Sequence, residues 1–270
     1  MTRSGAARLS EIIVTLVVTI GCAPPPEPPD LDNPDAGPDP NAPLLLSITP
    51  DDGDEDVDTR PIFHLRFDRH IDAATLESNR FSLESGPARG HGIQTLYNPT
   101  EKEVLVWPGW HLMPESTWVF SVKSGILGTN EAQITPGVLA TFRTSKESEN
   151  KTPYLQRGFQ NEIMPIFNHH CTSCHGGAGA GIAELKLDNK ENILETAISV
   201  AATGRQEWKR IAPARPGKSY LLYKLTSDEL IAGLRMPRTI DGSKSPPQLN
   251  KEEKTALFDW IATGAHFVDP

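Results

Sequence analysis

Cysteine is scarce in this sequence, since 270 residues contain three, at Cys22, Cys171 and Cys174. A structural zinc site takes four tetrahedral ligands, usually from two separated pairs of cysteine or histidine. Because Cys22 is remote from the other two cysteines in the sequence, histidines beside Cys171 and Cys174 would have to complete such a site. The cysteine count therefore disfavours a zinc knuckle.

The sequence also has no excess of basic residues. Lysine and arginine total 26 against 35 aspartates and glutamates, which gives a formal net charge of −9. Nucleic-acid-binding domains carry a basic patch and a positive balance, so we expect no nucleic-acid partner. Apolar residues make up 37% of the chain and prolines number 24, which favours extended connectors and β structure over a continuous helical bundle.

The first apolar run is too short to cross a membrane. Residues 12–20 are apolar apart from threonines and follow Arg3 and Arg8, whereas a membrane-spanning helix needs about 20 apolar residues. This pattern predicts an export signal over residues 1–22. Its end, Thr-Ile-Gly-Cys, resembles a bacterial lipoprotein processing site, which implies a lipid on Cys22 that attaches the protein to a membrane. Thr19 stands where leucine is usual, so an ordinary signal peptide or an uncleaved anchor remains an alternative.

Extended and β-forming segments follow the signal. Residues 23–42 are rich in proline and aspartate and cannot bury a core, which predicts a Pro/Asp-rich linker near polyproline II. Apolar and polar residues then alternate as in half-buried strands, with turn residues between the alternating segments. The clearest such segments are residues 62–67, 104–107, 118–122 and 139–142. About seven short strands at this spacing predict an antiparallel β-sandwich over residues 43–146.

The predicted sandwich resembles the bacterial Ig-like domains of secreted and cell-surface proteins. The motifs that carry this resemblance lie in residues 47–53, 59–67, 71–76, 112–118 and 141–144. The resemblance implies a spacer or adhesion module without chemistry of its own.

An acidic cluster in this stretch has the first spacings of a calcium-binding EF-hand loop, at Asp54, Asp56 and Asp58. Thr59 stands where such a loop needs glycine, and Leu65 stands where it needs a bidentate glutamate. We therefore interpret the cluster as a solvated turn.

The most specific motif is Cys-Thr-Ser-Cys-His at residues 171–175. Cys-x-x-Cys-His is the attachment pattern of a c-type haem. Cys171 and Cys174 would form thioether bonds to the porphyrin, and His175 would be the proximal ligand of the iron. A zinc site, a thioredoxin-like redox pair and a plain disulfide are the alternatives, although no βαβ pattern, which a redox pair needs, is readable nearby.

The period of the apolar residues changes to that of helices from about residue 150. Apolar positions three and four apart predict a helix over residues 155–167 that leads into the motif, and Pro165 should kink or end it. The same spacing predicts a helix over residues 193–201 and another over 220–225, with Ser219 as its N-cap.

The last predicted helix has the clearest boundaries. Asn250 and Glu253 form a capping-box pattern at its start, and Gly264 is a good stop. Its inner face consists of Leu257, Trp260 and Ile261.

The iron of a c-type haem needs a sixth ligand or keeps an open position. After removal of the signal, Met113, Met164 and Met236 remain. Met113 belongs to the predicted sandwich, and Met164 lies on the helix that leads into the proximal side. Met236 lies in an irregular segment, where small c-type cytochromes place a distal thioether that raises the reduction potential. Met236 could instead be a packing residue. The rival ligands are His169, His170 and His266.

Residues 155–267 resemble the planctomycete-type cytochrome c domain. The motifs that carry the resemblance lie in residues 163–167, 171–176, 185–188, 212–222, 235–237 and 260–265. The resemblance implies a cytochrome-c-like, all-α fold over residues 151–270, with covalent haem c and an iron held by His175 and Met236. Arg238 replaces the second proline that usually follows the methionine of this family, which changes the distal loop.

We therefore expect a multidomain protein in which an all-β Ig-like sandwich precedes an all-α cytochrome-c-like domain. The expected function is that of an exported, lipid-anchored monohaem cytochrome in the bacterial cell envelope, facing the periplasm or the outer surface. It would exchange single electrons with redox partner proteins and would have no catalytic residue. The alternatives are a peroxidase-like haem enzyme with an open distal site, and a surface-structural protein with a non-redox haem or metal.

Overall fold

A computed structural model of the chain describes residues 39–89, 92–146, 148–149, 151–177, 182–227, 229–238 and 248–269. The predicted signal, most of the predicted linker and the predicted lipidation site Cys22 lie outside these residues. None of the helices in the described ranges has the length and apolar character needed to cross a membrane.

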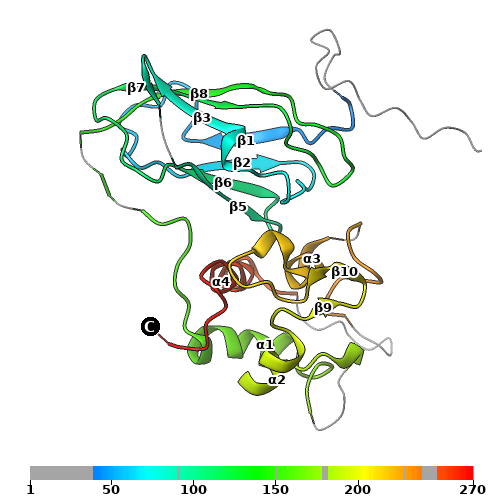
Figure 1. Cartoon of the computed structure of the whole chain (residues 1–270). Helices are drawn as coiled ribbons and strands as arrows, with labels where there is room; N and C mark the ends of the chain where they lie inside the picture. The colour runs from blue at the N-terminus through cyan, green and yellow to red at the C-terminus, as the bar shows by residue number, and fades with distance from the viewer. Residues whose placement is uncertain are drawn as a thin grey trace, which may run out of the picture. The chain divides into compact units, whose positions relative to one another are not determined.

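Within the described residues of 39–146, eight strands form two four-stranded antiparallel sheets that face each other (Figure 1). One sheet has the order β1-β2-β6-β5 and the other has the order β4-β3-β7-β8. A short 3-10 turn, η1 (Ser78–Arg80), precedes β3. The strands are β1 (Leu45–Thr49), β2 (Phe63–Phe67), β3 (Phe81–Ser85), β4 (Ala88–Arg89), β5 (Gln94–Asn98), β6 (Glu103–Trp107), β7 (Thr117–Val122) and β8 (Gly137–Arg143).

The alternation in the sequence explains the core of this sandwich. Every second residue of β2 is buried, and its Phe63 stacks on Phe120 of β7 with ring centroids 3.9 Å apart. Phe142 of β8 meets Phe63 edge to face at 5.5 Å. Residues i and i+2 of a strand share one face, so the alternating segments place their aromatic rings between the two sheets. The predicted sandwich is confirmed.

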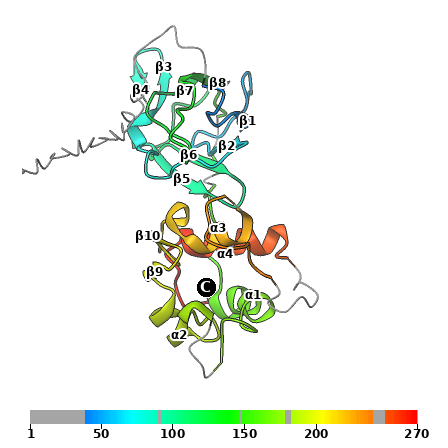
Figure 2. The same cartoon turned by 90° about the vertical axis from the view of Figure 1, so that its right-hand side faces the viewer.

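The C-terminal part, residues 151–269, has a mixture of short elements. Its elements are a single π-helical turn η2 (Phe159–Ile163), the helices α1 (Met164–His170), α2 (Lys190–Thr196), α3 (Tyr220–Thr226) and α4 (Lys251–Ala262), the strands β9 (Ala201–Ala202) and β10 (Arg205–Lys209), and the 3-10 turns η3 (Ile182–Glu184) and η4 (Pro216–Lys218). Figure 2 shows α1 and α2 on one side of this part and α3 with α4 on the other.

The prediction of an all-α cytochrome-c-like domain over residues 151–270 was wrong. Three of the described helices have only seven residues, and an antiparallel pair of strands, β9 and β10, lies between α2 and α3. The predicted helix over residues 193–201 ends at Thr196, and Ser199, three residues further on, adopts a left-handed conformation with φ of 59°. Apolar spacing over so short a stretch does not distinguish one helix from a helix followed by a strand.

Two predicted features of the helices turned out differently. Pro165 does not end the helix, since it lies in the first turn of α1 directly after the π-helical turn η2, where the helical run changes from π to α. Ser219 occupies the N-cap position of α3, but its hydroxyl accepts a hydrogen bond from the Ala212 N–H at 2.8 Å and gives α3 no side-chain cap.

The prediction for α4 is confirmed. The Asn250 side chain accepts from the Glu253 N–H, and the Glu253 carboxylate accepts from the Asn250 N–H, both at 2.8 Å. Gly264 follows the helix with φ of 107°, a conformation that favours glycine. The predicted inner face of α4 is buried, with Trp260 packed against Phe159 and Phe167 at centroid distances of 5.9 and 6.0 Å.

Candidate functional site

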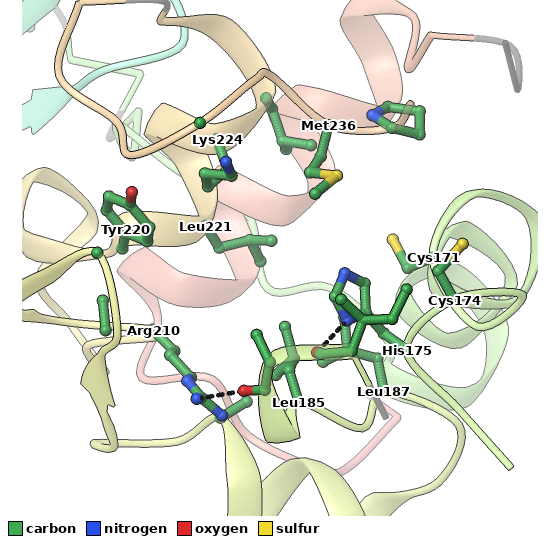
Figure 3. Close-up of a pocket in the computed structure, with 18 of the residues that line it drawn as sticks. Cys171, Cys174, His175, Leu185, Leu187, Arg210, Tyr220, Leu221, Lys224 and Met236 are labelled. Atoms are coloured by element: carbon green, nitrogen blue, oxygen red, sulfur yellow. Dashed lines mark hydrogen bonds between the residues drawn. The ribbon is translucent and has the colours of Figure 1, made fainter. Parts of the chain in front are cut away.

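The two C-terminal cysteines and the histidine that follows them lie in one tight turn at the end of α1. The Cys171 N–H donates to the Phe167 carbonyl at 2.8 Å where the helix ends. The N–H groups of Cys174 and His175 then both donate to the Cys171 carbonyl, at 3.2 and 2.9 Å. The turn thereby gathers two thiols and one imidazole on one side of a cavity (Figure 3).

The chain segment after His175 holds this turn in place. The Leu187 N–H donates to the His175 carbonyl at 2.6 Å, and the Asp188 carboxylate accepts from the Gly177 N–H at 3.0 Å. At Gly176, a Cβ atom would lie 2.8 Å from the Thr172 carbonyl oxygen. This position therefore needs glycine because the backbone of the turn passes so close to it.

The protonation of His175 follows from its hydrogen bond. Nδ1 lies 3.0 Å from the Ile182 carbonyl oxygen, and because a carbonyl can only accept, Nδ1 carries the proton. Burial lowers the pKa of His175 below its ordinary value, although the bond to Ile182 opposes this shift. The imidazole is therefore neutral near pH 7, and Nε2 is left with a lone pair, as in imidazoles that bind metals.

Neither of the two cysteines forms a disulfide in this structure. Burial, with a smaller contribution from Cys174, raises the pKa of the Cys171 thiol to about 12. At neutral pH the Cys171 thiolate is therefore a negligible fraction, which sets it apart from the low-pKa thiols of redox-active cysteines.

The cavity beside the turn has a volume of about 490 Å³, within the range of roughly 300–1,000 Å³ typical of ligand and cofactor pockets. Much of its wall is apolar. The apolar side chains along it include Leu185, Leu187, Ala197, Ile211, Leu221 and Leu225. Figure 3 shows Met236 on the wall opposite His175, with its sulfur turned toward the cavity. The cavity thus joins four residues singled out in the sequence: Cys171, Cys174, His175 and Met236.

The charged residues along the described cavity wall are all cations. They are Arg210, Lys224 and Arg238, and no aspartate or glutamate occurs among the described lining residues. Arg210 donates from Nη1 to the carbonyls of Glu184 and Thr196 at 2.9 and 2.8 Å, and the negative charge of Glu184 offsets part of its positive charge. Burial lowers the pKa of Arg210 below its ordinary value. A ligand with anionic groups would relieve this cost.

The residues weighed against Met236 are placed less well for a ligand. His170 lines the cavity, but its Nε2 lies 3.0 Å from the Glu253 carboxylate. His169 and His266 are exposed and are not among the described residues that line the cavity. Met164 is buried in the apolar cluster around Trp260, and Met113 is 47% exposed in the sandwich.

The described residues hold no group of three or more His, Cys, Asp or Glu side chains arranged to bind a metal ion. In the acidic cluster of the sandwich, Asp58 accepts from the N–H groups of Arg60 and Glu149, and Asp54 accepts from the Asp51 N–H. These bonds support the interpretation of a solvated turn.

Comparison with known families concerns the sandwich. Residues 39–144 match the family model of the bacterial Ig-like domain. These residues are a bacterial Ig-like domain. The resemblance predicted for this stretch is confirmed, and an Ig-like domain of this kind indicates an extracellular or envelope-associated protein.

Three solved structures are similar to this chain, each over about two fifths of this chain's length. The S-layer protein rSbsC(31-844) is 16% identical, with a TM-score of 0.30 over 43% of this chain and 16% of that one. The L,D-transpeptidase of Mycobacterium smegmatis is 14% identical, with a TM-score of 0.28 over 38% of this chain and 40% of that one. CopC of Methylosinus trichosporium OB3b is 15% identical, with a TM-score of 0.27 over 42% of this chain and 99% of that one. No curated protein matches the sequence.

Sequence reasoning missed three residues of the site. Ile182 fixes the orientation of His175 through a backbone carbonyl, which carries no sequence signal. Arg210 and Lys224 reach the cavity because the chain folds back on itself, and in the sequence they look like ordinary surface cations. A search for basic residues in apolar surroundings would have found Lys224, which stands among Leu221, Leu222 and Leu225.

Proposed function

We propose that this chain is an exported c-type cytochrome with one covalently attached haem. It would exchange single electrons with redox partner proteins in the cell envelope. The observation that supports this best is the convergence of Cys171, Cys174, His175 and Met236 on one cavity from segments far apart in the sequence. A Cys-x-x-Cys-His motif alone occurs by chance far more often than the same motif facing a methionine across a cavity.

The donor set suits haem c. Paired thiols on one turn can form the two thioether bonds, and the neighbouring imidazole has an unprotonated Nε2 as axial ligand. A thioether on the opposite wall would complete an imidazole–thioether pair, which is found in electron-transfer cytochromes and raises the reduction potential. With Met236 as a ligand there would be no open distal position of the kind that a peroxidase-like enzyme needs, so this residue favours an electron carrier.

The shape and charge of the cavity also suit this group. A porphyrin is flat and apolar, and carries two propionates at one edge. The wall offers apolar side chains together with the cations Arg210 and Arg238. Arg210 is half-buried, and taking a cation partly out of water is costly unless it is paired. The propionates would add to the pairing that Glu184 gives Arg210.

Each part of the chain then has a defined task. Haem c, when bound, supplies a one-electron couple at its iron. The turn at the end of α1 holds the two sulfurs and the imidazole, and the Ile182 carbonyl keeps the proton on Nδ1. The apolar wall formed by Leu185, Leu187 and Leu221 limits contact with water, which helps to set the reduction potential.

The N-terminal region would place this site in the envelope. A lipid on Cys22 would attach the chain to a membrane, with the linker and the Ig-like domain as spacers between membrane and haem. The similarity of residues 155–267 to planctomycete-type cytochrome c domains supports the proposal through the motifs around the proposed ligands, although the all-α fold that this resemblance implied was wrong.

Expression of the full chain in a host that exports and matures c-type cytochromes tests the proposal. The expected product is red and keeps its haem stain in a denaturing gel. The double variant with both Cys171→Ser and Cys174→Ser should lose the stain. Met236→Ala should keep the stain, bind carbon monoxide and lower the potential by on the order of 0.1 V. Met113→Ala, at an exposed methionine of the Ig-like domain, should change neither property.

Two results would contradict the proposal. One is a colourless wild-type protein from a host that matures a control cytochrome in parallel. The other is a purified protein with stoichiometric zinc in place of iron.

A further inference from the structure

The segment that carries Met236 has little apolar burial of its own. Ala232, Gly233, Leu234 and Arg235 are exposed, and Leu234 is 63% exposed. Gly233 has φ of 70°, so the chain turns sharply there. A segment of this kind depends on hydrogen bonds to keep its shape.

One face of α3 supplies these hydrogen bonds. The Lys224 ammonium donates to the carbonyls of Ala232 and Leu234, at 3.0 and 2.6 Å. The Lys224 carbonyl accepts from the Met236 N–H at 2.7 Å. One turn earlier on α3, the Tyr220 hydroxyl accepts from the Ala232 N–H at 2.7 Å. Residues four apart on a helix share a face, so both side chains reach the same segment.

The other end of the segment is held separately. Gln248, just before α4, donates from Nε2 to the Pro237 carbonyl at 2.9 Å. Met236 therefore lies between two attachment points, one on α3 and one beside α4. Figure 3 shows Lys224 and Met236 on the same wall of the cavity, facing the turn with His175.

We propose that Lys224 is the positioning residue for Met236. The Lys224 ammonium bonds two carbonyls just before Met236, and the Lys224 main-chain carbonyl accepts from the Met236 N–H. Together these bonds would fix the backbone from which the thioether reaches the iron. This role rests on the proposed function, because it concerns Met236 as the sixth ligand.

The chemistry of lysine suits this task. An ammonium group has three donors and no acceptor, so it can bond two carbonyls at once. Hydrogen bonds from a charged donor are about twice as strong as neutral ones. Loss of these two bonds should leave the fold of α3 intact, since Leu222 and Leu225 anchor that helix with exposures of 0% and 4%. The Met236 segment would then move away from the cavity more often.

The Lys224→Met variant of the full chain tests this role, because methionine keeps the apolar stem and removes the donors. Haem staining should be unchanged. Carbon monoxide, which must displace Met236 from the ferrous iron, should bind roughly tenfold faster or more, since two hydrogen bonds are lost. Hydrogen exchange at the Met236 amide should accelerate by a similar factor. The Lys224→Arg variant, which keeps donors and charge, should restore most of the wild-type behaviour.

Lys209→Met is the matched control, because Lys209 is an exposed lysine on β10. It should leave carbon monoxide binding and Met236 exchange unchanged. If a haem-loaded Lys224→Met protein matches the wild type in both measurements, Lys224 does not position Met236, and the proposed function stands. A change in reduction potential alone would show a charge effect and also overturn the positioning role. A colourless wild type would overturn the proposed function, and with it the role of Met236 as a ligand.

Discussion

The Ig-like domain and the C-terminal part fill their interiors in different ways. In the Ig-like domain, Phe63 and Phe120 are fully buried and stack between the sheets at 3.9 Å. In the C-terminal part, Phe167 and Trp260 are equally buried and pack edge to face at 6.0 Å. A cavity of about 490 Å³ nevertheless remains in the C-terminal part. The Ig-like domain fills the space between its sheets with its own side chains, and the C-terminal part leaves a space unfilled.

This difference bears on stability. Helices α1, α2 and α3 have seven residues each, and isolated helices shorter than about 12 residues are marginal in water. Their stability depends on packing, and part of their packing surface faces the cavity. A ligand that fills the cavity should therefore stabilise the C-terminal part, with little effect on the Ig-like domain.

The largest effect should come from the aromatic core of the Ig-like domain. Phe63→Ala should lower the free energy of unfolding of this domain by about 3–5 kcal/mol, because it leaves a cavity between tightly packed sheets. Hydrogen exchange measured peptide by peptide should show faster exchange in β2, β6 and β7 and almost unchanged exchange in α1 and α4. Equal acceleration in α1 and α4 would mean that the two regions unfold together and that the comparison does not hold.

A second effect concerns pH and comes from His70 of the Ig-like domain, whose ring also lies 5.3 Å from that of Tyr223 in α3. Burial lowers the pKa of His70 from 6.5 to about 4, with a smaller contribution from Lys102. Between these two pKa values the unfolded chain binds more protons than the folded one, so stability is lost as pH falls through this window. The loss should reach up to about 3 kcal/mol.

Urea unfolding at a series of pH values measures this slope. The His70→Gln variant should show a smaller dependence of the free energy of unfolding on pH, whatever its stability at pH 7. His64→Gln, at a histidine whose side chain is 43% exposed, should leave the slope in place. A slope that survives His70→Gln would assign the pH dependence to other groups.

The smallest effect should come from the capping box of α4. Asn250→Ala removes the side chain that accepts from the Glu253 N–H, and should destabilise the C-terminal part by about 1 kcal/mol. Asn168→Ala, at an exposed position of α1, should cost a few tenths of a kcal/mol or less. Thermal unfolding of the haem-free and haem-loaded protein should show a smaller shift in the loaded form if the ligand supports α4. Equal shifts in both forms would show that the cavity and α4 are energetically separate.

The sequence was sufficient wherever a pattern is local. Alternation over residues 62–67 predicted β2 because one face of that strand is buried and the other is not. The Asn250 and Glu253 pair predicted the start of α4 because a capping box closes within a single helical turn. The spacing of Cys171, Cys174 and His175 likewise sets their common location, since one turn carries all three.

The sequence was insufficient where tertiary structure decides. The apolar stripe over residues 193–201 suggested one helix, but α2 ends at Thr196, Ser199 is left-handed, and Ala201 pairs with Lys209 in the short sheet. The meeting of Met236 with His175 could be expected from a resemblance, but not from any local pattern. The contacts of Arg210 and Lys224 with backbone carbonyls exist only after the chain has folded.

The close approach at Gly176 has a consequence for how this chain can vary. With the Thr172 oxygen only 2.8 Å from where a methyl group would sit, even alanine cannot enter without opening the turn. The restriction comes from the polypeptide itself, so it acts before any prosthetic group arrives. Selection at this site would therefore preserve glycine for the sake of the turn itself, whatever the turn binds.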